Sequence, residues 1–292
     1  MRFWGRYLKT IFNRFASKMV PVDQSRSIEA VLKNGLLLVD TETRNEICAF
    51  ILAHQTNKGG FVDRAGNPDL YYTLFGTYLA EALSLTDVLN KIKDYLIDVE
   101  ENKKLTGIYL NCAVIIHTKL FGSETLPADI HKNALNEMKQ NKKTQHAYSS
   151  FIHLLTLYHL KDYLATHSLI KKIRTKESDT LPPCTVTAAE LILCSLTHKP
   201  VEQITKQLLS FNRPNGGFVA LDKTKIEDLL STGVALYALN YVKADLRLIK
   251  PECLSFIDSL YLDGGFRAME LDIETDIEYT FYGLLALGSL TN

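Results

Sequence analysis

The chain has 292 residues, of which 46% are apolar and 23% charged, and its formal net charge is zero. This composition is ordinary for a soluble globular protein with one large domain or two small ones. A neutral chain lacks the excess of lysine and arginine that nucleic-acid binding needs, and the uncharged run 279–292 is too short to span a bilayer.

Residues 1–22 stand apart, because they carry five basic residues and no acidic one. Aromatic and aliphatic residues recur there at three- and four-residue steps, which predicts an amphipathic helix. A basic amphipathic helix suits a membrane interface. The alternatives are a helix that packs on the domain and a transit peptide, which is also arginine-rich and poor in acids. We expect residues 23–292 to form a single domain.

The rest of the chain reads as helix after helix, without alternating strand patterns or a proline-rich linker. An amphipathic helix is predicted over 40–55 and an apolar helix over 69–85. Five more such pairs follow: 87–99 with 107–121, 127–140 with 146–159, 162–175 with 185–196, 201–211 with 228–242, and 251–260 with 276–290. One pair cannot bury its own apolar face. We therefore predict an all-α (α/α)6 toroid with six inner and six outer helices.

A Gly-Gly-Phe turn recurs three times, beginning at Gly59, Gly216 and Gly264. In each copy a polar loop leads to Asp-x-x-x-Thr at the start of an apolar helix. Paired glycines permit a tight reversal, and an aspartate at a helix start accepts hydrogen bonds from free backbone N–H groups. We expect the three loops to share one end of the toroid, around an apolar and aromatic-lined axis.

This repeat resembles that of the protein prenyltransferase β-subunits and the terpenoid cyclases, whose domains are α/α toroids. The resemblance covers nearly the whole chain after residue 40. Its best local match runs from Phe50 through Gly59-Gly60-Phe61 to Gly76. That stretch is similar to the repeat of Rab geranylgeranyltransferase β-subunits that supplies a zinc-ligand histidine.

The positions of the prenyltransferase zinc ligands hold other residues in this chain. The family uses an Asp and a Cys two residues apart, and a His in the next repeat. Here Asp228 is followed by Leu230, and Tyr279 stands at the histidine position, as Tyr72 does in the first repeat. Leucine cannot bind zinc, and no thiolate is present to activate a protein thiol. We therefore expect no zinc and a divergent member of the superfamily.

The class II terpenoid cyclases offer a second comparison, because they carry DxDD followed by Thr at an inner helix start. Asp276-Ile277-Glu278-Tyr279-Thr280 falls on that frame. The resemblance implies that Glu278 is the acid that protonates an alkene and that Asp276 orients it. Tyr279 would fill the place of the missing carboxylate. These three residues are the predicted catalytic set.

Basic residues of the loops form the core of a predicted substrate site, since in the prenyltransferases such residues hold the isoprenoid diphosphate. The alternative is scattered surface cations. With the polar residues at the inner helix starts, the predicted set is Arg64, Asp69, Tyr72, Lys223, Lys225, Asp228 and Arg267. The acidic segment 270–278 would suit Mg²⁺ bridged to a diphosphate; otherwise it is a solvated loop. No other cofactor is predicted.

The predicted function is an isoprenoid- or lipid-binding toroid, a prenyltransferase-like transferase or terpenoid-cyclase-like enzyme that acts without the usual zinc. The alternative is a non-catalytic toroid: a pseudoenzyme, a scaffold, or a β-type subunit that needs a partner chain. Five cysteines without CxxC spacing indicate reduced thiols in a cytoplasmic protein. Residues 1–22 would place it at the periphery of a membrane. No nucleic-acid partner is expected.

Overall fold

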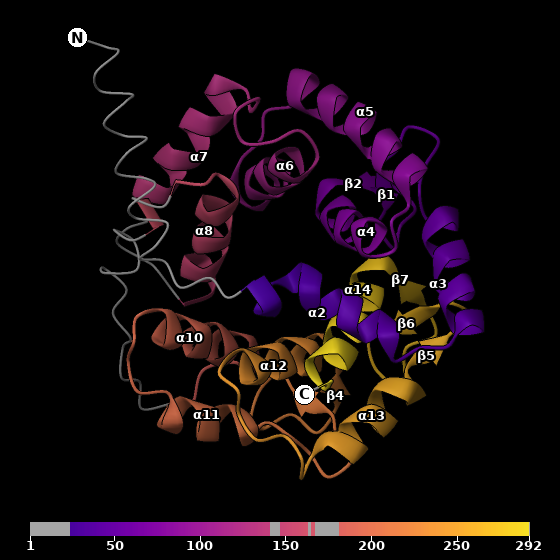
Figure 1. The fold of residues 1–292 in the computed structure, drawn as a ribbon, viewed down its shortest axis with the longest axis vertical. Coiled ribbons are helices and arrows are strands. Elements are labelled where there is room, and N and C mark those ends of the chain that lie inside the picture. The colour runs from indigo at the N-terminus through magenta and orange to yellow at the C-terminus, as the bar shows by residue number, and fades with distance from the viewer. Residues whose placement is uncertain (1–23, 141–146, 163–164, 167–180, 292) are drawn as a thin grey trace.

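The computed structural model describes residues 24–140, 147–162, 165–166 and 181–291, in which helices form a ring of two layers (Figure 1). The inner helices are α4 (Leu70–Ala82), α6 (Gly107–Leu120), α8 (Ala147–His159), α10 (Cys184–Leu196), α12 (Leu229–Tyr241) and α14 (Ile277–Ser289). The described outer helices are α3 (Thr41–Ala53), α5 (Thr86–Asn102), α7 (Ala128–Gln140), α11 (Glu202–Leu209) and α13 (Lys250–Ser259). Each inner helix contacts the next, and α14 contacts α4, which closes the ring.

The predicted all-α toroid is therefore confirmed. The helix predicted over 162–175 lies for the most part outside the described residues, and the segment 1–22 lies wholly outside them. Among the helices that are described, none is long and apolar enough to cross a membrane.

Short β-strands form hairpins at the Gly-Gly-Phe turns and the loops that follow them. They are β1 (Phe61–Val62) with β2 (Pro68–Asp69), β3 (Phe218–Val219) with β4 (Glu227–Asp228), and β5 (Tyr261–Leu262) with β6 (Gly265–Arg267) and β7 (Thr275–Asp276). The same register recurs, because the phenylalanine of each turn pairs with the aspartate before the inner helix. Strands this short carry no alternating pattern, so the sequence predicted loops here.

The threonine of each Asp-x-x-x-Thr motif fastens its hairpin to its helix. Thr73 Oγ1 donates to the carbonyl of Asp69 at 2.6 Å and accepts from the N–H of Phe61 at 3.0 Å. Thr232 and Thr280 make the equivalent pairs of hydrogen bonds. All three threonines are fully buried. The motif thus has a structural role in every copy in which it is clear.

The first glycine of each turn packs against the backbone of the next outer helix. Gly59 has φ of 97°, and a Cβ there would lie 1.9 Å from the carbonyl oxygen of Lys91 in α5. Gly216 approaches the backbone of α13 in the same way, and Gly264 approaches the backbone of α3 at Glu46. The last hairpin therefore returns to the first outer helix, and this contact joins the two ends of the repeat array.

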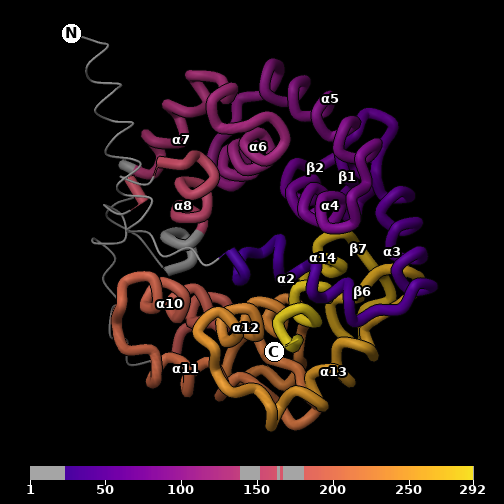
Figure 2. Tube along the Cα trace, viewed as in Figure 1, coloured from indigo at the N-terminus to yellow at the C-terminus, as the bar shows by residue number. Residues whose placement is uncertain are grey.

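One helix was not predicted. The chain runs from a 3₁₀ turn, η1 (Gln24–Arg26), into α2 (Ile28–Leu37), which crosses the middle of the ring in projection (Figure 2) and contacts α14 and α4. The crossing with α14 is close, since a Cβ on Gly288 would lie 1.8 Å from the carbonyl oxygen of Val31. Helix α2 belongs to no repeat unit, so a search for helix pairs passes over it.

Polar contacts hold α2 where the inner helices end. Lys119 in α6 donates to Glu29 of α2 at 2.5 Å and forms an ion pair with Glu81 of α4 at 2.7 Å. The Tyr237 hydroxyl of α12 donates to the carbonyl of Arg26 at 2.9 Å. Helix α2 therefore lies across the end of the toroid opposite the three hairpins.

Candidate functional site

The candidate site lies at the hairpin end of the ring, which we call the mouth. Its residues come from the first and last clear repeats, which ring closure makes neighbours, and Tyr109 is added from the start of α6. We call them the mouth cluster: Arg64, Asp69, Tyr71, Tyr72, Tyr109, Asp272, Asp276, Glu278 and Tyr279.

Arg64 joins the loop of the first hairpin to the loop of the last. Its Nε donates to Asp276 Oδ2 at 2.6 Å and its Nη2 donates to Asp272 Oδ2 at 2.7 Å. The guanidinium also lies 5.3 Å from the ring centroid of Tyr279, within cation–π range. Burial alone would raise the pKa of Asp272, but the hydrogen bond and charge of Arg64, together with hydrogen bonds from the backbone, outweigh burial, and the pKa is lowered. Two carboxylates therefore satisfy this arginine.

The three aspartates that open the inner helices act as helix caps, as predicted. Asp276 Oδ1 accepts from the N–H of Tyr279 at 2.8 Å, and Asp228 Oδ1 accepts from that of Ser231 at 2.7 Å. Asp69 Oδ1 accepts from the N–H of Tyr71 at 2.7 Å. Each satisfies backbone groups that have no partner within the helix.

Glu278 is the buried acid of the cluster, with 9% of its surface exposed. Its Oε1 accepts a hydrogen bond from the Tyr71 hydroxyl at 2.7 Å. Burial raises the pKa of Glu278, and the nearby charge of Asp276 adds to the rise, whereas the hydrogen bond from Tyr71 and the charge of Arg64 oppose it. The group therefore holds its proton to a higher pH than an exposed glutamate, as a general acid requires.

An aromatic wall runs from Glu278 into the ring. The ring centroids of Tyr71 and Phe75 are 4.8 Å apart, those of Phe75 and Phe281 are 4.9 Å apart, and those of Phe281 and Tyr78 are 5.7 Å apart. Tyr71 and Tyr78 lie seven residues apart in α4, which corresponds to about 10 Å along a helix. The wall is thus long enough to lie beside an extended apolar chain.

At the end of the wall next to α2, Tyr78 contacts two polar side chains, Lys119 and His159. Lys119 Nζ lies 4.2 Å from the ring centroid of Tyr78, and the Tyr78 hydroxyl is 3.3 Å from His159 Nε2. Burial and the charge of Lys119 lower the pKa of His159 to about 4, so this imidazole is neutral at pH 7.

Helix α12 has an accessible apolar face inside the ring. Leu230, Val234 and Tyr237 recur at helical spacing and are half-buried, whereas Leu236 and Leu239 are fully buried. The outward side of α12 is covered, because α11 packs there. The half-buried face therefore lies toward the axis, beside α14, which contributes Phe281 to the aromatic wall.

The predicted site residues divide into two groups. The structure brings Arg64, Asp69, Tyr72, Asp276, Glu278 and Tyr279 together at the mouth. Burial, with the charges of Asp276 and Glu278, raises the pKa of Tyr72 well above its usual range. Burial and the charge of Glu278 raise the pKa of Tyr279 to about 12.

The other predicted residues lie elsewhere. Lys223 and Lys225 are exposed in the loop between β3 and β4. Arg267 Nη2 donates to the carbonyl of Ser259 at 2.5 Å, so its side chain reaches toward α13 rather than into the cluster. Asp228 caps α12, where its charge adds only slightly to the raised pKa of Tyr279.

The hydrogen bond from Tyr71 to Glu278 was not predicted, although the repeat contains the signal for it. Tyr71 lies two residues after Asp69, just as Glu278 lies two residues after Asp276. Equivalent positions of neighbouring inner helices meet at the mouth, so superposing the first and last repeats would have paired them. The zinc positions show Asp228, Leu230 and Tyr279, and within the described ranges no group of three or more His, Cys, Asp or Glu side chains is arranged to hold a metal ion.

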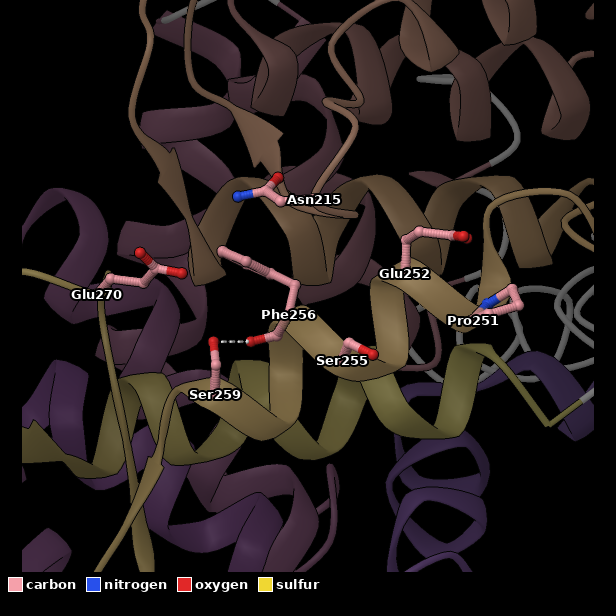
Figure 3. Close-up of a pocket in the computed structure, with 7 residues that line it drawn as sticks. All are labelled: Asn215, Pro251, Glu252, Ser255, Phe256, Ser259 and Glu270. Carbon is pink, nitrogen blue, oxygen red and sulfur yellow. Dashed lines mark hydrogen bonds between the residues drawn. The ribbon is translucent and has the colours of Figure 1, made fainter.

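A groove of about 400 Å³ lies on the outside of the ring along α13 (Figure 3). Glu252 and Glu270 lie on either side of Phe256, and the Ser259 hydroxyl donates to the carbonyl of Phe256 at 2.7 Å. No residue of the mouth cluster lines this groove. The buried acid and the aromatic wall make the mouth the stronger candidate.

The fold and the mouth define an α/α toroid of the kind that encloses an apolar axis. The family model of the prenyltransferase alpha-alpha toroid domain matches residues 31–94 and 181–291, which is more than half of the chain. The protein belongs to this family. The matched ranges contain all three Gly-Gly-Phe hairpins. A search of curated proteins gives no match.

The raised pKa of Glu278 predicts a pH-dependent effect of Glu278→Gln on stability. The folded protein holds this proton more tightly than the unfolded chain, so ionisation of Glu278 destabilises the fold as the pH rises from about 4.3 through the folded pKa. We expect the variant to be more stable than the wild type at about pH 8, with the difference vanishing near pH 4, in urea denaturation.

The control for this titration is Glu42→Gln, which removes an exposed carboxylate from the first turn of α3. It should show no gain in stability as the pH rises. A difference between Glu278→Gln and the wild type that does not change with pH would contradict the assignment.

Proposed function

We propose that the toroid binds a long apolar molecule of the isoprenoid type along its axis and that Glu278 donates a proton to an alkene of that molecule. The observation that carries the proposal is the position of Glu278. It is a buried carboxyl group with a raised pKa, and it lies at the end of the aromatic wall that is nearest the mouth. Membership of a toroid family supports the apolar axis but not any particular reaction.

The step balances without a metal or a redox partner. The O–H bond of Glu278 breaks and a C–H bond forms at one alkene carbon, which leaves a cation on the other carbon. The rings of Phe75 and Phe281, whose centroids are 4.9 Å apart, would stabilise such a cation through their π-electrons. The Tyr71 hydroxyl stabilises the carboxylate that remains. The cation is quenched when it loses a proton or captures water, and Glu278 recovers its proton from solvent at the mouth.

A non-catalytic toroid is the second candidate, and a specific observation favours it. Asp69, Asp228 and Asp276 all cap helices, and Arg64 is engaged by two carboxylates. Such contacts stabilise the ring whether or not chemistry takes place. In this case the apolar axis binds a ligand or a partner and Glu278 performs no reaction.

The proposal requires ligand binding at the axis, and thermal unfolding with geranylgeraniol tests it. A ligand at 100 times its Kd stabilises the folded state by about 2.7 kcal/mol. Val234→Phe adds volume to the half-buried axial face of α12 and should abolish the shift. Leu248→Phe, at a site 93% exposed, is the matched control and should keep it. If neither geranylgeraniol nor squalene shifts the wild type, the proposal fails.

A further inference from the structure

The charge of the mouth limits which molecules can enter it. We propose that the ligand arrives uncharged, as a hydrocarbon or an alcohol, and that the mouth selects against a diphosphate head group. This inference rests on the proposed apolar ligand and specifies its chemical class. It concerns the residues around the opening rather than the proton donor itself.

The three hairpin loops carry a local excess of acid. Residues 62–69, 219–228 and 267–276 together contain nine acidic and four basic residues, although the whole chain is neutral. Glu278 adds a further carboxyl group just inside the opening. A dianionic or trianionic head group that enters here meets a field of its own sign, which lowers both its association rate and its affinity.

The two arginines of these loops do not offset this field at the mouth cluster. Arg64 already donates to Asp272 and Asp276 at 2.7 and 2.6 Å. Arg267 donates to backbone carbonyls near α13. Tight phosphate recognition needs donors that converge on the anion, most effectively a guanidinium that presents two N–H groups. The described residues around Glu278 supply no such arrangement.

The groups that do line the mouth suit an uncharged molecule. Tyr71, Tyr72 and Tyr279 are half-buried and present aromatic rings with hydroxyl groups. Such side chains accept an alkene or an alcohol without leaving a charge unpaired. Arg64 is the residue best suited to bind phosphate, but it already links the first hairpin to the last. If it bound phosphate instead, the contact between these two hairpins would be lost.

Paired ligands test the inference. Geranylgeraniol and geranylgeranyl diphosphate share one carbon skeleton, so their binding differs only through the head group. We expect the alcohol to bind at least about tenfold more tightly than the diphosphate at low ionic strength, and added salt to narrow the gap. Equal or tighter binding of the diphosphate overturns the inference and leaves the proposed function standing. If neither ligand binds, the proposed function fails, and the inference with it.

A charge variant identifies the responsible residues. Asp272→Asn removes one acid from the mouth and weakens one of the two hydrogen bonds that Arg64 donates to carboxylates. It should shift the ratio of the two affinities toward the diphosphate. Asp94→Asn removes one acid from an exposed position of the outer helix α5 and should leave the ratio unchanged. An equal change in both variants would mean that overall charge, not the mouth, sets the preference, and would overturn the inference.

Discussion

Gly59→Ala should unfold the protein or leave it barely stable. The new Cβ would lie 1.9 Å from the carbonyl oxygen of Lys91 and 2.4 Å from its carbonyl carbon, which are backbone atoms within α5. Neither atom can move without displacing the helix, so the hairpin must lose its packing against α5. We expect a loss of about 4 kcal/mol or more of the free energy of unfolding, from a total of about 5–15 kcal/mol. Urea denaturation measures it.

Gly66→Ala is the matched control. Gly66 also has positive φ, 81° against 97° for Gly59, but a Cβ there meets nothing within 4 Å. Both variants carry the conformational penalty of a left-handed alanine, about 1 kcal/mol, and only Gly59→Ala adds the collision. Similar losses in the two variants would show that backbone conformation, not the contact with α5, is decisive.

Glu278→Gln should abolish any alkene protonation by the protein. The amide keeps the shape of the side chain and can still accept from Tyr71, but it has no proton to give. Incubation of the wild type with squalene or geranylgeraniol in deuterium oxide should yield a product with one solvent deuterium per turnover. Mass spectrometry should find none of this product with the variant, a loss of at least about 10²–10⁴-fold.

Asp228→Asn provides the comparison for Glu278→Gln. Asp228 opens a neighbouring inner helix, and burial raises its pKa as well. An asparagine can still cap α12, so this variant should keep deuterium incorporation. Equal losses at both positions would indicate a shared structural role for these acids. Full incorporation by Glu278→Gln would contradict the proton-donor role.

The sequence predicted those parts of the fold that repeat. The Gly-Gly-Phe spacing located the hairpin end, and Asp-x-x-x-Thr located the caps of three inner helices, because both depend on local backbone geometry. Helix α2 was missed because it lies outside the repeat. The contacts of Arg64 were missed because its partners lie 208 and 212 residues away, a pairing that appears only when the ring closes.

The site was predicted in part for the same reason. Asp276 and Glu278 stand at fixed offsets within a repeat, so their place at an inner helix start could be read directly. The orientation of Lys223, Lys225 and Arg267 could not, because a loop side chain has no periodic constraint on its direction. Basic residues in equivalent loops therefore lie at different places on the protein surface.

The packing of Gly264 on α3 has a consequence for biosynthesis. Helix α3 and the hairpin that packs on it are separated by more than 200 residues, so the ring cannot close until the last hairpin and α14 have left the ribosome. Until then the surface of the first repeat that the last repeat will cover is exposed to solvent, and α2 has no α14 to pack against. We expect such a chain to fold slowly and late, with its nascent form depending on chaperones more than its finished form does.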